Sequence, residues 1–204
     1  MIKFDNVSIK YTNDFYCLLE YSKTINHNTL FVGDFYSGTN SIMRIISKID
    51  KHYSGVVTID DINIKTIKDK DLSVACLPEN PVFFKFKNIF NNIYFSLKLR
   101  KIYKKTAKNT INSIKNEFNL NFFDKKIKNL NINEKKIICL IRALLWSPKI
   151  LLLENFFENL DDDFADVACK LIDKFAPNTL IVACEKVLST AQIFKDFELI
   201  NLEQ

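Results

Sequence analysis

Two of the three glycines in this 204-residue chain lie in one short segment that could bind phosphate. The segment reads Gly33-Asp34-Phe35-Tyr36-Ser37-Gly38-Thr39-Asn40-Ser41. It follows the apolar run 29–32 and precedes residues 42–46, whose apolar positions have helical spacing. A glycine loop between a strand and a helix can direct backbone N–H groups at an anion. The pattern therefore predicts a phosphate loop over residues 33–41.

The charged group of such a loop is missing. The phosphate-loop pattern G-x-x-x-x-G-K, followed by Ser or Thr, requires a lysine where Thr39 stands and a hydroxyl where Asn40 stands. Thr39 supplies no positive charge, and an amide oxygen at Asn40 is a poorer ligand for Mg²⁺. We therefore expect a loop that no longer binds ATP tightly. Weak anion binding by its N–H groups remains open.

The composition limits the kind of protein. Hydrophobic residues make up 48% of the chain and charged residues 26%, as in ordinary globular proteins. No apolar run approaches the ~20 residues that span a bilayer, and the N-terminus lacks the pattern of a secretory signal. The five cysteines form no C-x-x-C pair, and the two histidines have no metal-ligand spacing. We expect reduced thiols, a cytoplasmic location and no metal site.

Positive charge is concentrated in one stretch of the chain. The formal net charge is +5. Residues 96–128 hold ten Lys or Arg and two acidic residues, which leaves −3 for the remainder. Because the lysines are scattered, the favoured interpretation is a solvated helical face. Nucleic acid or an anionic membrane surface is the alternative partner.

The pattern of apolar residues predicts an α/β fold. Strands are predicted over 2–9, 29–32, 56–60, 72–77, 150–153 and 179–183, and helices over 42–46, 90–103, 107–118 and 135–146. The runs 150–153 and 179–183 are continuously apolar, which is typical of central parallel strands covered on both faces. The economical interpretation is one domain over 1–204 with a helical subdomain inserted over 88–134.

Together these segments resemble the ATP-binding domain of ABC transporters, in the P-loop NTPase superfamily, over nearly the whole chain. The matching segments are 1–8 (opening strand), 33–41 (Walker A), 54–61 (the S-G-x-V turn), 77–81 (Q-loop), 130–134 (signature), 141–145 (A-R-A-L helix), 148–154 (Walker B) and 159–161 (D-loop). The resemblance implies an ABC ATPase core with a mixed, mainly parallel sheet flanked by helices, an N-terminal antiparallel β part and an inserted α-helical subdomain.

The resemblance also assigns positions to the site. Cofactor-binding positions are Tyr11, Gly33, Ser37, Gly38, Thr39, Asn40 and Ser41, and catalytic positions are Glu79, Glu154, Asn155 and Cys184. Signature positions are Leu130, Asn131, Ile132, Asn133 and Glu134, and D-loop positions at the dimer contact are Asn159, Leu160 and Asp161. Tyr11 falls where the family stacks an aromatic ring on adenine. Surface packing is its alternative role.

This chain departs from the family where polar chemistry occurs. Glu79 replaces the Q-loop glutamine, and Asn155 replaces the glutamate that polarises the attacking water. Cys184 replaces the switch histidine and is expected to be a small buried apolar residue. Glu154 keeps a carboxylate that is one methylene longer than the Walker B aspartate. Each lost group costs roughly 3–4 kcal/mol of barrier, so no catalytic set is predicted to be intact.

The signature has lost its serine and both glycines. Ile132 adds bulk and Glu134 adds negative charge where a partner's γ-phosphate would lie. Neither a homodimer nor a heterodimer would then form a complete site. We predict a pseudo-ATPase, that is, a structural or regulatory partner in a membrane transport complex. ATP and Mg²⁺ are implied by the resemblance, but we do not expect firm binding of either.

An aromatic cluster follows the Q-loop and includes Phe83, Phe84, Phe86 and Phe90. In the family this region lines the groove that receives a membrane partner. Core packing of the helical subdomain is the alternative. The predicted partners are a second ABC-type subunit and a membrane-embedded subunit, at the cytoplasmic face of a membrane, with no nucleic acid.

Two other functions remain open. A divergent but active ATPase would need a cation from elsewhere, and Arg44 or Lys48 are the candidates. A nucleic-acid-binding module would use the basic stretch, and its binding would depend steeply on salt.

Overall fold

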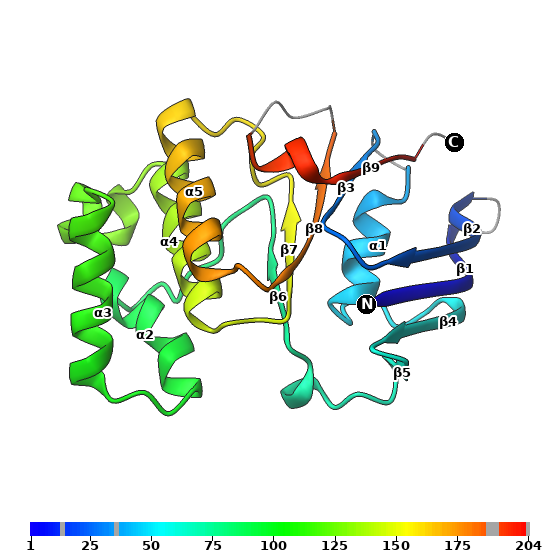
Figure 1. Ribbon diagram of the computed structural model, residues 1–204, viewed down its shortest axis with the longest axis horizontal. Coiled ribbons are helices and arrows are strands. Elements are labelled where there is room, and N and C mark those ends of the chain that lie inside the picture. Colours follow the sequence, from blue (N-terminus) through cyan, green and yellow to red (C-terminus); the bar gives the residue numbers. More distant parts are fainter. Residues whose placement is uncertain (13–14, 35–36, 187–191, 203–204) are drawn as a thin grey trace. The chain divides into compact units, whose positions relative to one another are not determined.

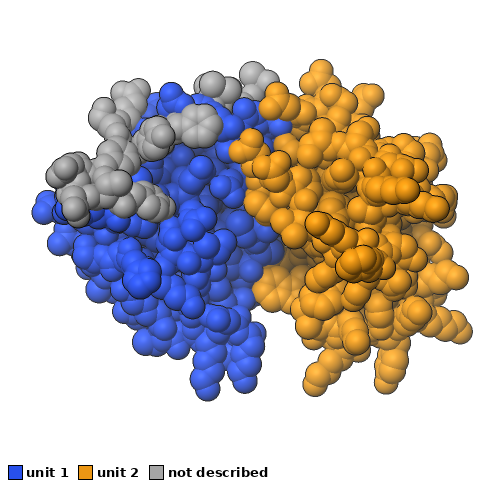
Figure 2. Space-filling model, turned by 180° about the vertical axis from the view of Figure 1, so that it is seen from behind, with its two compact units in different colours: residues 1–76, 149–158, 179–204 blue, residues 77–148, 159–178 orange. Residues whose placement is uncertain are grey.

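The computed structural model describes residues 1–12, 15–34, 37–186 and 192–202 (Figure 1). The chain divides into two compact units (Figure 2). Unit 1 comprises residues 1–76, 149–158 and 179–204, and unit 2 comprises 77–148 and 159–178. The subdomain predicted over 88–134 lies within unit 2. Its bounds, and those of one domain over 1–204, stay a prediction.

Unit 1 contains two sheets. The antiparallel sheet has the strand order β2-β1-β4-β5, formed by β1 (Ile2–Thr12), β2 (Phe15–Ile25), β4 (Ser54–Ile59) and β5 (Ile62–Asn63). The other sheet has the order β6-β7-β8-β3-β9, formed by β6 (Val74–Leu77), β7 (Ile150–Glu154), β8 (Leu180–Glu185), β3 (Thr29–Val32) and β9 (Glu198–Asn201). Strands β7, β8, β3 and β9 are parallel to their neighbours in this order. The predicted α/β fold, with an antiparallel part and a mainly parallel sheet, is confirmed.

The strands that the sequence predicts best are the central ones. Leu151, Leu152 and Leu153 in β7 are fully buried, as are Val182 and Ala183 in β8. Strands β2 and β9 were not predicted. The pairing of β1 with β2 shifts register several times, which interrupts the alternation of apolar and polar residues. Strand β9 is a short edge strand with no fully buried residue.

A bulge in β1 explains its apolar spacing. Ile2 and Phe4 are buried, and the next buried residues are Val7 and Ile9, so one extra residue separates the two pairs. The register with β2 shifts between Phe4 and Val7, and Asn6 has a positive φ of 51°. The bulge returns the second apolar pair to the core face.

Helix α1 (Thr39–Ile46) lies at the centre of the unit 1 core. Ile42, Ile45 and Ile46 are fully buried, in one cluster with apolar residues of both sheets. Only Asn40 and Arg44 are exposed along the helix. Tight packing on most sides therefore fixes the position of α1.

Unit 2 is helical, with α2 (Ile89–Leu99), α3 (Lys104–Glu117), α4 (Ile132–Leu145) and α5 (Asp162–Phe175). Helix α2 begins at Ile89 because the Asn88 side chain accepts a hydrogen bond from the Asn91 N–H at 2.9 Å. It ends before Lys101, whose φ is 59°. Short 3₁₀ turns, including η2 (Asn121–Asp124), connect α3 to α4. No helix in the described ranges is long and apolar enough to cross a membrane.

Candidate functional site

The carboxyl ends of three parallel strands bring the predicted site residues of unit 1 to one edge of the sheet. Val32 pairs with Glu185, and Cys184 pairs with both Phe31 and Glu154. The phosphate loop therefore begins beside the last residues of β7 and β8. Ligands of open α/β sheets bind at such an edge.

Both loop glycines are required by close packing. Gly38 has φ 92°, and a Cβ there would lie 2.4 Å from the Cys17 carbonyl oxygen. A Cβ at Gly33 would lie 2.4 Å from Ser37 Oγ and 2.8 Å from the Leu202 carbonyl oxygen. Gly38 is the N-cap of α1, and no described side chain caps this helix end. The backbone therefore has the form that suits an anion at a helix N-terminus.

Two polar side chains at the start of α1, Thr39 and Ser41, are buried. Thr39 is 6% exposed and its hydroxyl accepts from Ser37 Oγ at 3.4 Å. Ser41 is 3% exposed and hydrogen-bonds the Cys17 thiol, which partly offsets the rise in the pKa of Cys17 caused by burial. Asn40 is exposed, and its Oδ1 accepts from Cys184 Sγ at 3.5 Å. The position that would supply a hydroxyl to Mg²⁺ therefore holds a neutral amide oxygen, which is a poorer ligand for this ion.

The thiols at this edge are protonated and unreactive. Cys184 is 1% exposed, as the sequence predicts. Burial, and then the negative charge of Glu154, raise the pKa of Cys184 far above its usual range. The same two causes raise the pKa of Cys76 to about 12. A protonated thiol is neither a nucleophile nor a metal ligand.

Asn155 and Glu185 shape the segment after β7. The Asn155 N–H donates to the Cys184 carbonyl at 2.9 Å, and Asn155 is 3% exposed with φ 45°. Sequence reasoning missed Glu185, which is also 3% exposed. Its carboxylate accepts from the Phe157 N–H at 3.1 Å, and its carbonyl accepts from the Gly33 N–H at 3.3 Å. An acidic residue directly after an apolar strand was the available signal.

Arg44 and Lys48, the two cations that could replace the missing lysine, interact with other groups. Arg44 forms two hydrogen bonds to Asp50, at 2.8 and 3.0 Å. Lys48 donates to the Ile67 carbonyl and forms an ion pair of 3.0 Å with Asp69. The loop itself contains no basic residue. The loop would therefore bind phosphate through its backbone N–H groups, with no positive side chain of its own.

Some predicted positions lie outside the described side chains. Tyr11 belongs to β1, but its side chain is not described, so its adenine-stacking role stays a prediction. Phe35 and Tyr36 of the phosphate loop also lie outside the described residues.

In unit 2 the predicted signature residues form the N-terminus of α4. The helix was predicted from residue 135 and begins at Ile132, because Asn131 and Glu134 form a capping box. Asn131 Oδ1 accepts from the Glu134 N–H at 2.8 Å, and Glu134 Oε2 accepts from the Asn131 N–H at 3.0 Å. Glu134 is 5% exposed and pairs with Lys125 at 2.6 Å. The chain's own carboxylate thus occupies this helix N-terminus, while Ile132 is 46% exposed.

A hydrogen bond links the predicted signature segment to the predicted D-loop. Leu130 is 4% exposed and anchors the chain before the cap. The Asn133 amide donates to the carboxylate of Asp161, which is the N-cap of α5. Asn159 has φ 56° and Leu160 is half-buried. The structure therefore brings the signature and D-loop positions together within unit 2.

The Q-loop and the aromatic cluster follow β6. Glu79 is half-buried, two residues after the strand. Phe83 lies under the Arg142 guanidinium, 5.8 Å from ring centre to Cζ. Phe84 packs against Phe95 with ring centres 4.8 Å apart. Phe86 is fully exposed and does not pack in a core.

A buried amide holds the loop that carries these rings, and sequence reasoning missed it. Asn92 is 0% exposed. Its Oδ1 accepts from the Phe84 N–H at 2.9 Å, and its Nδ2 lies 3.1–3.3 Å from three backbone carbonyls, those of Phe84, Lys87 and Asn88. Phe90 lies elsewhere: it stacks on Tyr94 at 5.6 Å and lines a separate pocket. Asn92 occupies a buried position of the helix where the apolar pattern would place an apolar residue, so the pattern did not indicate its hydrogen bonds.

No group of three or more metal-ligating residues occurs in the described part of the chain. Taken together, the unit 1 edge offers an uncapped helix N-terminus and two carboxylates, without a basic side chain in the loop. Phosphoryl transfer depends on groups that neutralise charge, and the loop itself supplies no basic side chain for this.

A family model and two similar curated proteins agree on one protein family. Residues 23–157 match the family model described as ABC transporter. The chain is 26% identical over 164 residues to the molybdate/tungstate import ATP-binding protein WtpC of Pyrococcus horikoshii, covering 79% of this chain and 47% of the relative. It is 25% identical over 172 residues to the methionine import ATP-binding protein MetN of Helicobacter hepaticus, covering 79% and 48%. The chain thus spans about half the length of these relatives.

Solved structures share the fold. A bacterial Atm1-family ABC exporter with ATP bound superposes with a TM-score of 0.82 at 19% identity, covering 99% of this chain and 36% of that chain. The structure of an ATP binding subunit of an ABC transporter superposes with a TM-score of 0.83 at 15% identity, covering 100% and 86%.

Proposed function

The chain belongs to the ABC transporter family, and we propose that it acts as an ATP-binding-type subunit that contributes shape and pairing to a membrane transport complex in place of ATP turnover. In this role it is a pseudo-ATPase. It pairs with a second ABC-type subunit and contacts a membrane-embedded partner. Neither ATP nor Mg²⁺ is held firmly.

The observation that carries the proposal is that the phosphate loop has no basic residue of its own. Residues 33–41 include no lysine or arginine, and the basic side chains that follow, Arg44 and Lys48, are paired with Asp50 and Asp69. Losing one charged or preorganised donor costs roughly 3–4 kcal/mol, or about 10²–10³-fold in rate. Recruiting either cation would also require breaking its existing ion pair.

The N-terminus of α4 supports the same conclusion. In the family, the signature of one subunit faces the γ-phosphate bound by the other. Here the Glu134 carboxylate already accepts the Asn131 N–H and is buried beside Lys125. A second anion at this helix end would be repelled by the first. A partner's ATP would therefore gain little from this surface.

Exposed apolar side chains after the Q-loop support contact with another subunit. Val82 is 64% exposed, Phe84 40% and Phe86 103%. Large apolar side chains grouped in sequence and exposed to water mark interaction sites. The relatives named above are ATP-binding proteins of import systems, which is consistent with a transport partner.

The test is an assay of Mg·ATP hydrolysis and binding by the purified chain. We expect no Mg-dependent phosphate release above the level of the Glu154→Ala variant, and no ATP-induced rise in melting temperature. Hydrolysis by the wild type that disappears in both the Glu154→Ala and the Asn155→Ala variants would instead identify a divergent active ATPase.

A further inference from the structure

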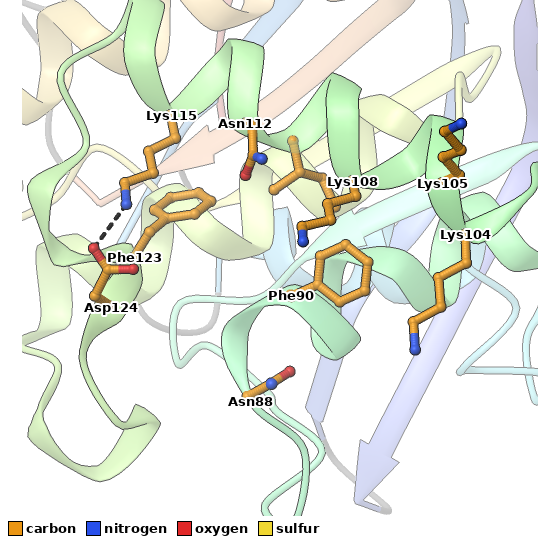
Figure 3. Close-up of a pocket in the computed structure, with 10 residues that line it drawn as sticks. Asn88, Phe90, Lys104, Lys105, Lys108, Asn112, Lys115, Phe123 and Asp124 are labelled. Atoms are coloured by element: carbon orange, nitrogen blue, oxygen red, sulfur yellow. Dashed lines mark hydrogen bonds and ion pairs between the residues drawn. The ribbon is translucent and has the colours of Figure 1, made fainter.

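Unit 2 contains a pocket of about 550 Å³ that no part of the proposed function uses. It lies between the start of α2, one face of α3 and η2 (Figure 3). Its volume is within the range of small-molecule sites, about 300–1,000 Å³. The pocket is therefore large enough for a small organic ligand.

The pocket wall from α3 is strongly basic. Lys104, Lys108 and Lys115 line it together with Lys105, against a single acidic residue, Asp124, so the lining has a formal net charge of +3. The spacing of 104, 108 and 115 places these lysines along one face of the helix. In Figure 3, Lys104 and Lys108 extend from α3 toward Phe90, and Lys105 extends away from it.

Most of this charge has no counter-ion among the residues that the structure describes. Lys115 pairs with Asp124 at 2.7 Å. In the ranges that the structure describes, no carboxylate lies within ion-pair distance of Lys104, Lys105 or Lys108. Like charges four residues apart on a helix destabilise it. A bound anion would relieve this repulsion.

The remaining lining is apolar and aromatic. Phe90 from α2 and Phe123 from η2 are half-buried, and Ile111 of α3 is buried at 2% exposure. Asn88 and Asn112 add amide donors and acceptors. A flat apolar group could contact the rings while an anionic group reaches the lysines.

We infer that this pocket binds a small organic phosphate that carries an aromatic or apolar group. Several lysines suit a phosphate dianion better than a single carboxylate, because each ammonium acts as a point charge. The pocket is open to solvent, and most of its lysines are exposed beside two aromatic rings, which favours a compact soluble ligand with both charge and an apolar group over a nucleic acid strand or a membrane surface. This inference does not depend on the proposed function, since none of the lining residues belongs to the phosphate loop or the signature.

The experiment is a calorimetric titration of the whole protein with 1-naphthyl phosphate. We expect a Kd of about 0.5 mM or tighter, from the ligand efficiency of a molecule of this size. The double variant Lys104→Gln/Lys108→Gln should bind about tenfold more weakly, since each exposed charge contact contributes up to roughly threefold. Glutamine keeps the helix propensity, so α3 should remain folded.

The matched control is Lys128→Gln/Lys170→Gln, which removes the same charge from exposed positions outside the pocket. It should bind 1-naphthyl phosphate like the wild type. No heat of binding in the wild type, or equal weakening in both double variants, would overturn the inference. So would lysine-dependent sedimentation with vesicles of phosphatidic acid and phosphatidylcholine without binding of 1-naphthyl phosphate, because that outcome identifies a lipid surface instead.

Discussion

Replacing Thr39 by lysine should strengthen ATP binding, because we propose that the wild-type loop does not hold ATP firmly. Position 39 is the first residue of α1, beside a glycine N-cap with no described side-chain cap. Gly38 already has the positive φ of a helix N-cap there, so the variant is designed to add the missing charge. A hydrogen bond to a charged group contributes about 1.5–3 kcal/mol, which corresponds to roughly 10- to 150-fold in Kd.

The same substitution should weaken the protein without ligand. Thr39 is 6% exposed, so an ammonium there is largely removed from water. An unsatisfied buried donor costs about 1–3 kcal/mol, and more when it is charged. We therefore expect the melting temperature of Thr39→Lys to fall below that of the wild type and to rise again with ATP. These opposite changes distinguish charge restoration from a general loss of packing.

The assay is a fluorescent ATP-analogue titration combined with thermal unfolding, with Thr39→Met as the control. Methionine has a similar length and no charge, so it should lower stability without any gain in ATP binding. Equal affinity in the lysine and methionine variants would refute the argument that the missing charge limits binding. Tight binding by the wild type would refute it as well.

Two further predictions concern stability. Asn92→Leu should lower the free energy of unfolding, measured in urea, by about 2–4 kcal/mol, because the Phe84 N–H and three carbonyls lose their hydrogen-bond partner. The control Asn109→Leu, on the exposed face of α3, should have little effect. Equal effects of the two substitutions would contradict the role of the Asn92 amide. Burial, and then the negative charge of Glu154, raise the pKa of Cys76 from 9.0 to about 12 in the folded protein. In the unfolded chain this thiol therefore loses its proton at a lower pH than in the folded protein. The free energy of unfolding should fall as the pH rises from 9 toward 12. Cys76→Ala should flatten this decline in alkaline unfolding curves, and an unchanged slope would show that other groups cause it.

Sequence patterns predicted the central strands and the loop because these depend on neighbouring residues. Strands β7 and β8 are continuous apolar runs, and burial on both faces needs no further information. Strand β2 could not be predicted, since its register with β1 shifts around positive-φ residues such as Asn6 and Glu20. Its apolar residues face the core only because of those shifts.

The candidate site was predicted in part. Sequence spacing identified the loop glycines, and the structure places them at the sheet edge with Glu154 and Cys184. Neither Glu185 nor Asn92 was predicted. Glu185 accepts from the Phe157 N–H, 28 residues away, whereas Asn92 contacts backbone groups four to eight residues earlier in the chain. Neither arrangement follows from the spacing of apolar residues.

Local residue types were sufficient to show that the phosphate loop lacks a lysine and that a strand, a loop and a helix follow one another. They left open whether Arg44 or Lys48 could replace the charge. Only the folded structure shows that these cations form ion pairs with Asp50 and Asp69. A residue's chemistry is set by its type, but its availability depends on which groups the folded chain brings within a few ångströms, and contacts between distant segments decide that.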